Sequence, residues 1–295
     1  MVFEDYFKNH ILPDQIHKLS VAFYVPEMKK NFGGTAGNIG YNLNLITDAF
    51  HIMSTAGNDF HAYKKWLTKN KINTDFIKII DDYFTAQAFI TTDLDDNQIT
   101  AFHPGAMSQS HQNSITEMKE NVELVLISPD GKEGMVNHAN EAFSLNLPFI
   151  FDPGQGLPMF NKEELHQFIQ QATYITVNDY EAEVLCKVAQ MRPEDISQQV
   201  DALIITKGAS GSTIMTPNKS YEIPAFSVEK PIDPTGCGDA YRAGIAYGIV
   251  QKWNWEKTGV LATALASLKV RSKGGQNHAP SIKDIENLAG LDLSN

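Results

Sequence analysis

The residues best suited to chemistry lie at positions 233–240, where the sequence reads D-P-T-G-C-G-D-A. Gly236 and Gly238 allow the backbone to curl so that successive N–H groups point at one spot. A helical pattern with small residues on one face follows, and a helix N-terminus adds partial positive charge there. Asp239 lies in the first turn of this expected helix, so a carboxylate stands beside a predicted anion site.

Such a pairing suits phosphoryl transfer. Backbone N–H groups from Gly236, Cys237 and Gly238 stabilise charge on a moving phosphoryl group, and the Asp239 carboxylate accepts the proton of an attacking hydroxyl. The residues alone also fit an ordinary capped helix start, where Asp and Gly are common. A nucleophilic role for Cys237 is a weaker interpretation than a small residue packed between two glycines.

A second glycine-rich turn lies at residues 33–40, G-G-T-A-G-N-I-G, and apolar residues at helical spacing follow it. Its glycine spacing differs from the dinucleotide fingerprint G-x-G-x-x-G, and the sequence contains no G-x-x-x-x-G-K-S/T phosphate loop. Close packing of a helix through small residues would explain the same pattern. The turn therefore predicts either a ligand loop or a tight helix contact.

The elements that must position these turns alternate along the chain. Strands are expected near 49–57, 124–128, 148–152, 174–178, 202–206 and 213–216, and helices near 60–70, 132–145, 162–172, 179–190, 239–251, 256–271 and 282–290. This order predicts one α/β domain over residues 1–295, with a mostly parallel sheet and helices on both faces. Ligands bind at the carboxyl ends of such strands, where Asp152, Asn178 and Lys207 fall.

Two further segments have the alternating pattern of strands. Residues 84–92 and 98–102 flank a turn-like segment and predict a hairpin, and residues 15–30 predict strands with one open face. A hairpin inserted between β and α elements fits a lid over a pocket, although an ordinary edge hairpin fits equally.

Composition restricts the partners. The formal net charge of -11 disfavours nucleic acid and anionic membrane and favours a small molecule. The two cysteines, Cys186 and Cys237, lack disulfide or zinc spacing, and no run of 18 apolar residues occurs. The N-terminus also lacks the pattern of a signal peptide. A cytoplasmic protein is expected.

Both glycine turns resemble the signatures of the ribokinase-like carbohydrate and nucleoside kinases, the phosphofructokinase-B (pfkB) family. The order and separation of the motifs match from about His10 onward. The resemblance implies a ribokinase-like fold with a small β-strand lid, formed here by residues of about 13–32 and 84–106. It implies that Asp239 is the catalytic base, that the backbone of residues 236–239 is the anion hole, and that Gly33, Gly34 and Asn38 hold the substrate.

Weaker motifs extend the resemblance to the cofactors, ATP and Mg²⁺. Asn178 and Glu181 match the N-x-x-E motif that organises Mg²⁺ and phosphate through water, although an N-cap with Glu at N3 is also a common stability motif. The segment T-K-G-A-S-G (Thr206, Lys207, Gly208 and Gly211) resembles the loop beside the ATP phosphates and ribose, although it also fits a plain hairpin turn. Asn277 matches the border of the adenine pocket.

Two polar residues have no settled role in the sequence. Asp152 matches only part of the family's D-x-N pattern and stays outside the catalytic set. Arg242, one turn into the helix after Asp239, is either a phosphate ligand or a surface cation.

The resemblance also implies a reaction. F-H-P-G-A-M at residues 102–107 resembles the version in nucleoside kinases, so we expect ATP-dependent phosphorylation of the 5'-hydroxyl of adenosine or a similar purine nucleoside. The alternatives are a ribose, fructose or related sugar kinase, a non-catalytic nucleoside-binding or nucleotide-binding protein and, third, a dinucleotide dehydrogenase. A homodimer is a possible assembly. The family's chains begin with a strand and a substrate-binding Asp, which we expect to lie upstream of Met1 in a longer reading frame or to have been lost.

Overall fold

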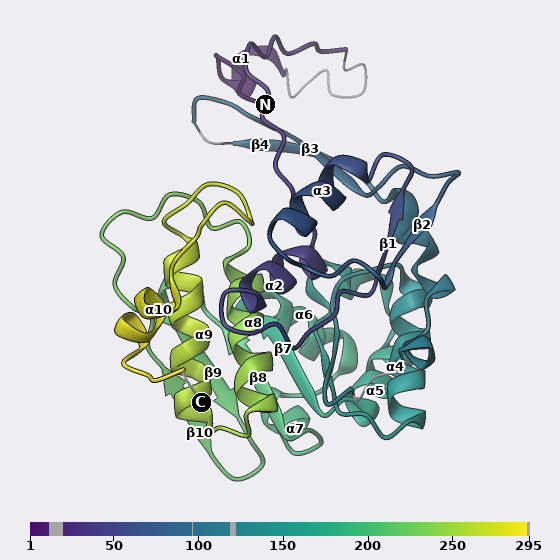
Figure 1. Ribbon diagram of the computed structural model, residues 1–295, viewed down its shortest axis with the longest axis vertical. Coiled ribbons are helices and arrows are strands. Elements are labelled where there is room, and N and C mark those ends of the chain that lie inside the picture. Colours follow the sequence, from purple (N-terminus) through teal and green to yellow (C-terminus); the bar gives the residue numbers. More distant parts are fainter. Residues whose placement is uncertain (12–19, 96, 119–121, 294–295) are drawn as a thin grey trace.

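A six-stranded sheet forms the centre of the protein (Figure 1). The computed structural model describes residues 1–11, 20–95, 97–118 and 122–293. The strands lie in the order β10-β9-β8-β7-β6-β5. Their bounds are β5 (Val125–Ile127), β6 (Phe149–Phe151), β7 (Tyr174–Asn178), β8 (Ala202–Thr206), β9 (Ser212–Met215) and β10 (Ser220–Ile223). Strands β5 to β8 are parallel, and β9 and β10 add an antiparallel edge. The predicted mostly parallel sheet is therefore confirmed, and the short β10 is an addition.

Helices cover both faces of this sheet because its strands are apolar on both sides. Phe149 and Phe151 point to one core and Ile150 to the other, and all three are fully buried. The helices over the first face are α4 (Lys132–Ser144), α5 (Lys162–Gln171), α6 (Asp179–Ala189) and α7 (Pro193–Ser197). The other layer contains α2 (Thr35–Leu43), α8 (Cys237–Val250), α9 (Trp255–Lys269) and α10 (Ile282–Ala289).

Close packing against α9 fixes the position of α8. A Cβ atom at Gly244 would lie 2.4 Å from the Cα atom of Ala262, and one at Gly248 would lie 2.4 Å from the hydroxyl of Thr258. The small-residue face recognised in the sequence thus lets two helix backbones approach closely. The N-terminus of α8 is held at the carboxyl-terminal edge of the sheet as a result.

A second, smaller body lies beside the sheet. Strands β1 (Ser54–Gly57) and β2 (Ile77–Ile80) pair in parallel, and α3 (His61–Lys69) connects them. The expected strand and helix near 49–57 and 60–70 are present with shorter bounds. Within the described residues, no strand pairs with the second edge of β1 or with the outer edge of β5. One cavity is lined by residues of both strands.

The predicted hairpin is confirmed as β3 (Gln87–Thr92) and β4 (Gln98–His103), which pair antiparallel away from the main sheet (Figure 1). The chain start pairs with β3: the Met1 ammonium donates to the carbonyl of Ile90 and the Phe3 N–H donates to that of Thr92. Short helices complete the described elements: α1 (Phe7–His10), η2 (Gly105–Gln112), η3 (Ile115–Glu117), η4 (Gly154–Met159) and η5 (Gly208–Ser210).

The expectation of lid strands within residues 15–30 is wrong for the part of this segment that the structure describes. Residues 20–30 form no strand, and Glu27 makes one isolated bridge to Val2. Residues 12–19 lie outside the described residues. Tyr24 and Met28 are 78% and 76% exposed, whereas the Phe23 ring packs against Phe3 and Phe7. The segment thus contacts the chain start through side chains, and it is residues 1–3 that lie alongside β3. No helix within the described ranges is long and apolar enough to cross a membrane.

Candidate active site

The loop before α8 is tied down by its own polar groups. The Asp233 carboxylate accepts hydrogen bonds from the N–H groups of Thr235 (2.9 Å) and Gly274 (2.7 Å). The Lys269 ammonium, on a fully buried residue, donates to the backbone carbonyls of Asp233 (2.8 Å) and Ser272 (3.0 Å). These contacts join residues 233–235 to residues 272–274, so the anion-site turn is held from two sides.

The turn itself presents free donors at the start of α8. Gly236 is the N-cap with φ +81°, a left-handed conformation that favours glycine. The Cys237 N–H donates to the carbonyl of Pro234 (3.0 Å), so this N–H already has an acceptor within the turn. Among the described residues, the N–H groups of Gly238 and Asp239 have no backbone acceptor. The anion-hole role that the sequence predicted for residues 236–239 stays a prediction, and Gly238 and Asp239 are the residues whose N–H groups have no backbone acceptor.

The Cys237 thiol has no electrostatic activation. Burial raises its pKa to about 11, and the nearby Lys269 ammonium opposes this only partly. A thiol with that pKa is protonated at neutral pH and is a poor nucleophile. This argues for Cys237 as a packing residue, the interpretation that the sequence favoured.

The side chain of Asp239 meets the second glycine turn. The Asn38 amide donates from Nδ2 to Asp239 Oδ2 at 2.7 Å, although the two residues are 201 positions apart. Asn38 is on α2, which begins after Gly33 and Gly34, and Gly34 has φ +88°. The fold therefore brings the predicted substrate residues to the predicted base.

Asp239 has the electrostatics of a base. Burial raises the pKa of its carboxyl to about 6, while the Asn38 hydrogen bond and the charges of Arg242 and Lys269 lower it and Asp152 raises it further. A carboxylate with a pKa near 6 is a better proton acceptor than one near 4 and is still mostly ionised at pH 7.

This value predicts the pH dependence of the reaction. Asp239 must be deprotonated to act, so kcat/KM should rise with pH through about 6 and level off above it. Initial rates measured between pH 4.5 and 8 check this rise, which is the acid limb of the profile of kcat/KM against pH. Asp130, whose pKa is also raised to about 6 by burial, is the competing assignment. The limb should keep its position in Asp130→Asn, and its disappearance in that variant would contradict the assignment to Asp239.

Arg242 is the centre of a buried charge cluster. Its Nε lies 2.5 Å from Asp152 Oδ2, and its Nη2 lies 4.0 Å from Glu181 Oε2. The Ser128 hydroxyl also donates to Asp152 (2.8 Å). Arg242 is 9% exposed, and Asp152 is fully buried. The surface-cation interpretation of Arg242 is therefore wrong. The sequence analysis did not predict that Asp152 is the partner of Arg242, because Asp152 matches only part of the family's motif.

Gly238 leaves room for this arginine. A Cβ atom at Gly238 would lie 2.6 Å from Arg242 Nη1. The second glycine of the turn therefore lets the guanidinium pass beneath the start of α8. It thereby connects the anion-site backbone to the buried carboxylates.

Asn178 and Glu181 cap α6 reciprocally. The Glu181 N–H donates to Asn178 Oδ1 (2.7 Å), and the Asn178 N–H donates to Glu181 Oε2 (2.8 Å). The stability interpretation of this motif is thus present in the structure. Burial raises the pKa of Glu181, and Arg242 opposes the shift. Both residues are committed to the cap through these atoms, and a role toward Mg²⁺ remains a prediction.

The segment from Thr206 to Gly211 forms the tight turn between β8 and β9. The Lys207 ammonium hydrogen-bonds to Thr213 (2.5 Å) and pairs with Glu222 (3.4 Å). Thr206 donates to the carbonyl of Val177 (3.4 Å). Gly208 and Gly211 have φ +56° and +88°. The hairpin-turn interpretation is therefore what the contacts show, and the ATP role of these four residues stays a prediction.

Asn277 stabilises the neighbouring loop. Its Nδ2 donates to the Lys273 carbonyl (2.8 Å) and to Asn31 Oδ1 (3.1 Å). The side chain thereby links residues 273–277 to the segment before α2. A border of an adenine pocket at this position remains a prediction.

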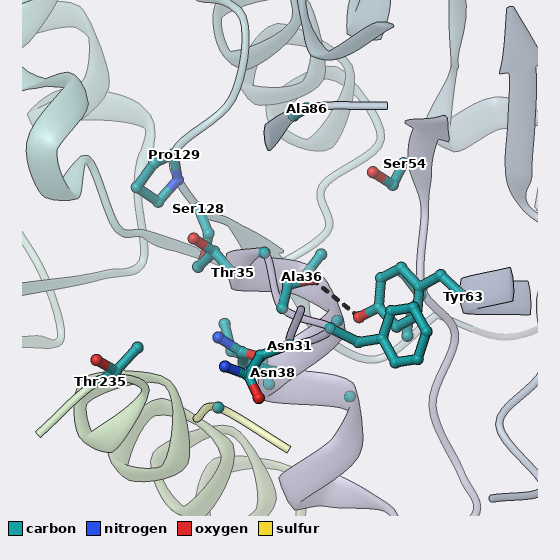
Figure 2. A pocket seen from close by; sticks show the side chains of 18 of the residues that line it. Asn31, Thr35, Ala36, Asn38, Ser54, Tyr63, Ala86, Ser128, Pro129 and Thr235 are labelled. Atoms are coloured by element: carbon teal, nitrogen blue, oxygen red, sulfur yellow. Dashed lines mark hydrogen bonds between the residues drawn. The ribbon is translucent and has the colours of Figure 1, made fainter. Parts of the chain in front are cut away.

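A cavity of about 1710 Å³ opens beside the Asn38 contact. Figure 2 shows part of its lining: Asn31, Thr35, Ala36, Asn38, Ser54, Tyr63, Ala86, Ser128, Pro129 and Thr235. Gly33, Gly34 and Asn38 are the predicted site residues in this lining, whereas the seven predicted cofactor residues are outside it. Three of the four predicted substrate residues thus share one hollow, whereas Asp239, the turn at residues 236–238 and the predicted ATP residues lie outside its lining.

These features define a class of protein. Asn38 lines the cavity and donates to the Asp239 carboxylate, and the N–H groups of Gly238 and Asp239 at the start of α8 have no backbone acceptor among the described residues. This is the arrangement of a small-molecule kinase, an ATP-dependent phosphotransferase with an alcohol acceptor.

Comparison with known proteins identifies the family. Residues 7–282 match the model of the pfkB family carbohydrate kinases. The chain belongs to this family, and it is an ATP-dependent sugar or nucleoside kinase with the ribokinase-like fold. The resemblance found in the two glycine turns is confirmed.

Several relatives are nucleoside kinases. The nucleoside kinase of Methanocaldococcus jannaschii is 35% identical over 264 residues, which are 89% of this chain and 86% of that protein. The structure of Burkholderia thailandensis nucleoside kinase in complex with inosine has 44% identity and a TM-score of 0.88, and the match covers 99% of this chain and 94% of that one. The ribokinase of Bacillus subtilis is 30% identical over 262 residues, covering 87% of each chain.

Proposed function

We propose that this kinase transfers the γ-phosphoryl group of ATP to the 5'-hydroxyl of a purine ribonucleoside, such as adenosine or inosine. The observation that carries the proposal is the 2.7 Å contact between Asn38 and Asp239 beside the cavity. The nucleoside class is supported by the relatives, among them the Burkholderia thailandensis enzyme solved with inosine and with ADP-inosine.

In the proposed reaction, Gly33, Gly34 and Asn38 hold the sugar so that the 5'-hydroxyl faces Asp239. The carboxylate takes the hydroxyl proton while the hydroxyl oxygen attacks the γ-phosphorus, and ADP leaves. The N–H groups of Gly238 and Asp239 stabilise the charge that develops on the transferred phosphoryl group. The acceptor is thus activated and the phosphoryl charge balanced at one helix end.

The residues present fit a water-mediated Mg²⁺ site better than a direct one. The described residues contain no group of three His, Cys, Asp or Glu side chains that could hold a metal ion. Mg²⁺ keeps most of its waters, so the buried Glu181 carboxylate, with Asn178, would hold the ion through them. When bound, the ion would neutralise charge on the ATP phosphates.

A sugar kinase is the alternative within the class, and the Bacillus subtilis ribokinase is the relative that favours it. A non-catalytic nucleoside-binding protein would need neither a carboxylate with a pKa of about 6 nor free N–H groups beside it. The site therefore favours catalysis.

A parallel assay of acceptors tests the proposal. ADP release from MgATP should be fastest with adenosine or inosine, and kcat/KM for ribose and fructose should be at least about tenfold lower, because the sugars lack the base that fills the pocket. Guanosine and cytidine define the base preference. Preferred turnover of ribose or fructose would support the sugar kinase, and tight nucleoside binding without ADP release would support the binding protein.

A further inference from the structure

We propose that Trp66 and Gln276 are positioning residues of this kinase: through a chain of hydrogen bonds they determine which atom of Asn38 faces the Asp239 carboxylate. The proposal rests on the role of Asp239 as the base in the proposed function. Neither residue belongs to the glycine turns, and Trp66 lies on α3 in the smaller body. The chain of contacts therefore couples that body to the predicted base.

Three hydrogen bonds make up the chain. The Trp66 indole Nε1 donates to Gln276 Oε1 (3.0 Å), Gln276 Nε2 donates to Asn38 Oδ1 (3.1 Å), and Asn38 Nδ2 donates to Asp239 Oδ2 (2.7 Å). Gln276 is 1% exposed and Asn38 is 6% exposed. Water competes little for these amides, so each one must find its partners within the protein.

The chain has a direction because its first member cannot reverse. An indole N–H is only a donor, so the atom of Gln276 that faces Trp66 must be the carbonyl oxygen. The Gln276 NH₂ group then faces Asn38, which must present its own carbonyl oxygen. Asn38 is left with its NH₂ group toward Asp239. The orientation of both amides thus follows from chemistry and from the order of contacts.

The orientation matters for the base. With the NH₂ group toward Asp239, Asn38 stabilises the ionised carboxylate. A reversed amide would place its carbonyl oxygen against the carboxylate and favour the protonated form instead. Glycine at 275 leaves room for the arrangement, since a Cβ atom there would lie 2.4 Å from Asn38 Oδ1.

A second branch from Gln276 reaches the predicted sugar-binding turn. Gln276 Nε2 also donates to the Tyr63 hydroxyl (2.5 Å), and that hydroxyl donates to the carbonyl of Gly33 (2.9 Å), the bond drawn as a dashed line in Figure 2. One glutamine therefore holds both the base's partner and the first glycine of the substrate turn.

The other ionisable groups around Asp239 limit what the chain can do. Arg242 and Lys269 favour the carboxylate, and Asp152 opposes it. Tyr63 has a pKa of about 12, and Cys237 one of about 11. Both are neutral over the working pH range. Removing the chain should therefore raise the pKa of Asp239 without abolishing its ionisation.

The test uses Trp66→Phe, Gln276→Glu and, as a control, Trp253→Phe. Trp66→Phe keeps an aromatic ring beside Phe32 but lacks the donor. Gln276→Glu keeps an acceptor for Trp66 but presents an oxygen to Asn38. Trp253 lies between α8 and α9, beyond the opposite end of α8 from Asp239. Thermal melting confirms that each variant is folded.

The direct readout is the pKa of Asp239 from the ¹³C shift of its carboxyl carbon, assigned with Asp239→Asn. We expect a rise of about 0.5–1 unit in Trp66→Phe, a larger rise in Gln276→Glu and no change in Trp253→Phe. The acid limb of kcat/KM should move by the same amount. At pH 5, a one-unit rise lowers the deprotonated fraction about tenfold.

The two proposals fail in different ways. An unchanged Asp239 pKa in folded Trp66→Phe and Gln276→Glu would overturn the positioning role, even if the enzyme phosphorylates nucleosides. A raised pKa in both variants, with no phosphorylation of any nucleoside by the unsubstituted protein, would leave the hydrogen-bond chain established and refute the proposed function.

Discussion

Replacing Asp239 with Asn is expected to lower kcat for the nucleoside about 10²- to 10⁴-fold, because the reaction loses the group that accepts the hydroxyl proton. The amide has nearly the same shape, and its oxygen can still accept the hydrogen bond from Asn38 Nδ2. KM for the nucleoside should therefore change little. Steady-state ADP release, with single-turnover measurements for the slow variant, checks both parameters.

Asp201→Asn is the matched control. Asp201 is exposed and directly precedes β8, at the end of the strand opposite to the predicted site residues that follow it. Its kcat should equal that of the unsubstituted protein within about twofold, since surface substitutions rarely matter. An Asp239→Asn variant that retains more than about a tenth of the activity would refute the assignment of the base.

The largest expected effect on stability comes from Arg242→Met. This substitution removes the cation that faces the buried carboxylates of Asp152 and Glu181, at 2.5 Å and 4.0 Å. Breaking a buried pair by deleting one partner typically costs about 3–5 kcal/mol, because the remaining charge is left uncompensated. Urea unfolding should show a loss of that order in the free energy of unfolding.

The exposed pair Arg192–Asp195, with an N–O distance of 2.9 Å, provides the comparison. Arg192→Met should leave the free energy of unfolding almost unchanged, because solvent screens exposed charges. Adding Asp152→Asn to Arg242→Met should recover part of the lost stability, since it removes the unpaired charge. Equal effects of the two arginine substitutions would contradict the buried cluster.

The sequence was sufficient wherever structure follows from local rules. Helix periodicity and caps placed α5, α6 and α10 within about one residue of their observed bounds. The turns at Gly34 and Gly236 could be recognised from the sequence because glycine readily adopts the positive φ angles that both residues have in the structure. Those local signals also put Asp239 in the first turn of a helix, which is the basis of the proposed chemistry.

Local rules failed where a partner was needed. The alternating pattern near residues 20–30 predicted strands, but a strand forms only against another strand. Lys207 was assigned to ATP by motif; the motif did not predict that its ammonium pairs with Glu222 in the folded chain, and the ATP role stays a prediction. A motif specifies a residue type and a spacing, and it does not specify which distant group the side chain will meet.

The sequence by itself determined the α/β alternation, the two glycine turns and the presence of a carboxylate at a helix start. Only the tertiary structure decided that Asn38 meets Asp239 across 201 residues, that Trp66 meets Gln276 across 210, and that Arg242 is buried between two carboxylates. The physical reason is that caps and positive φ angles arise within a few residues, whereas hydrogen bonds between distant side chains arise only when packed helices and strands bring them together.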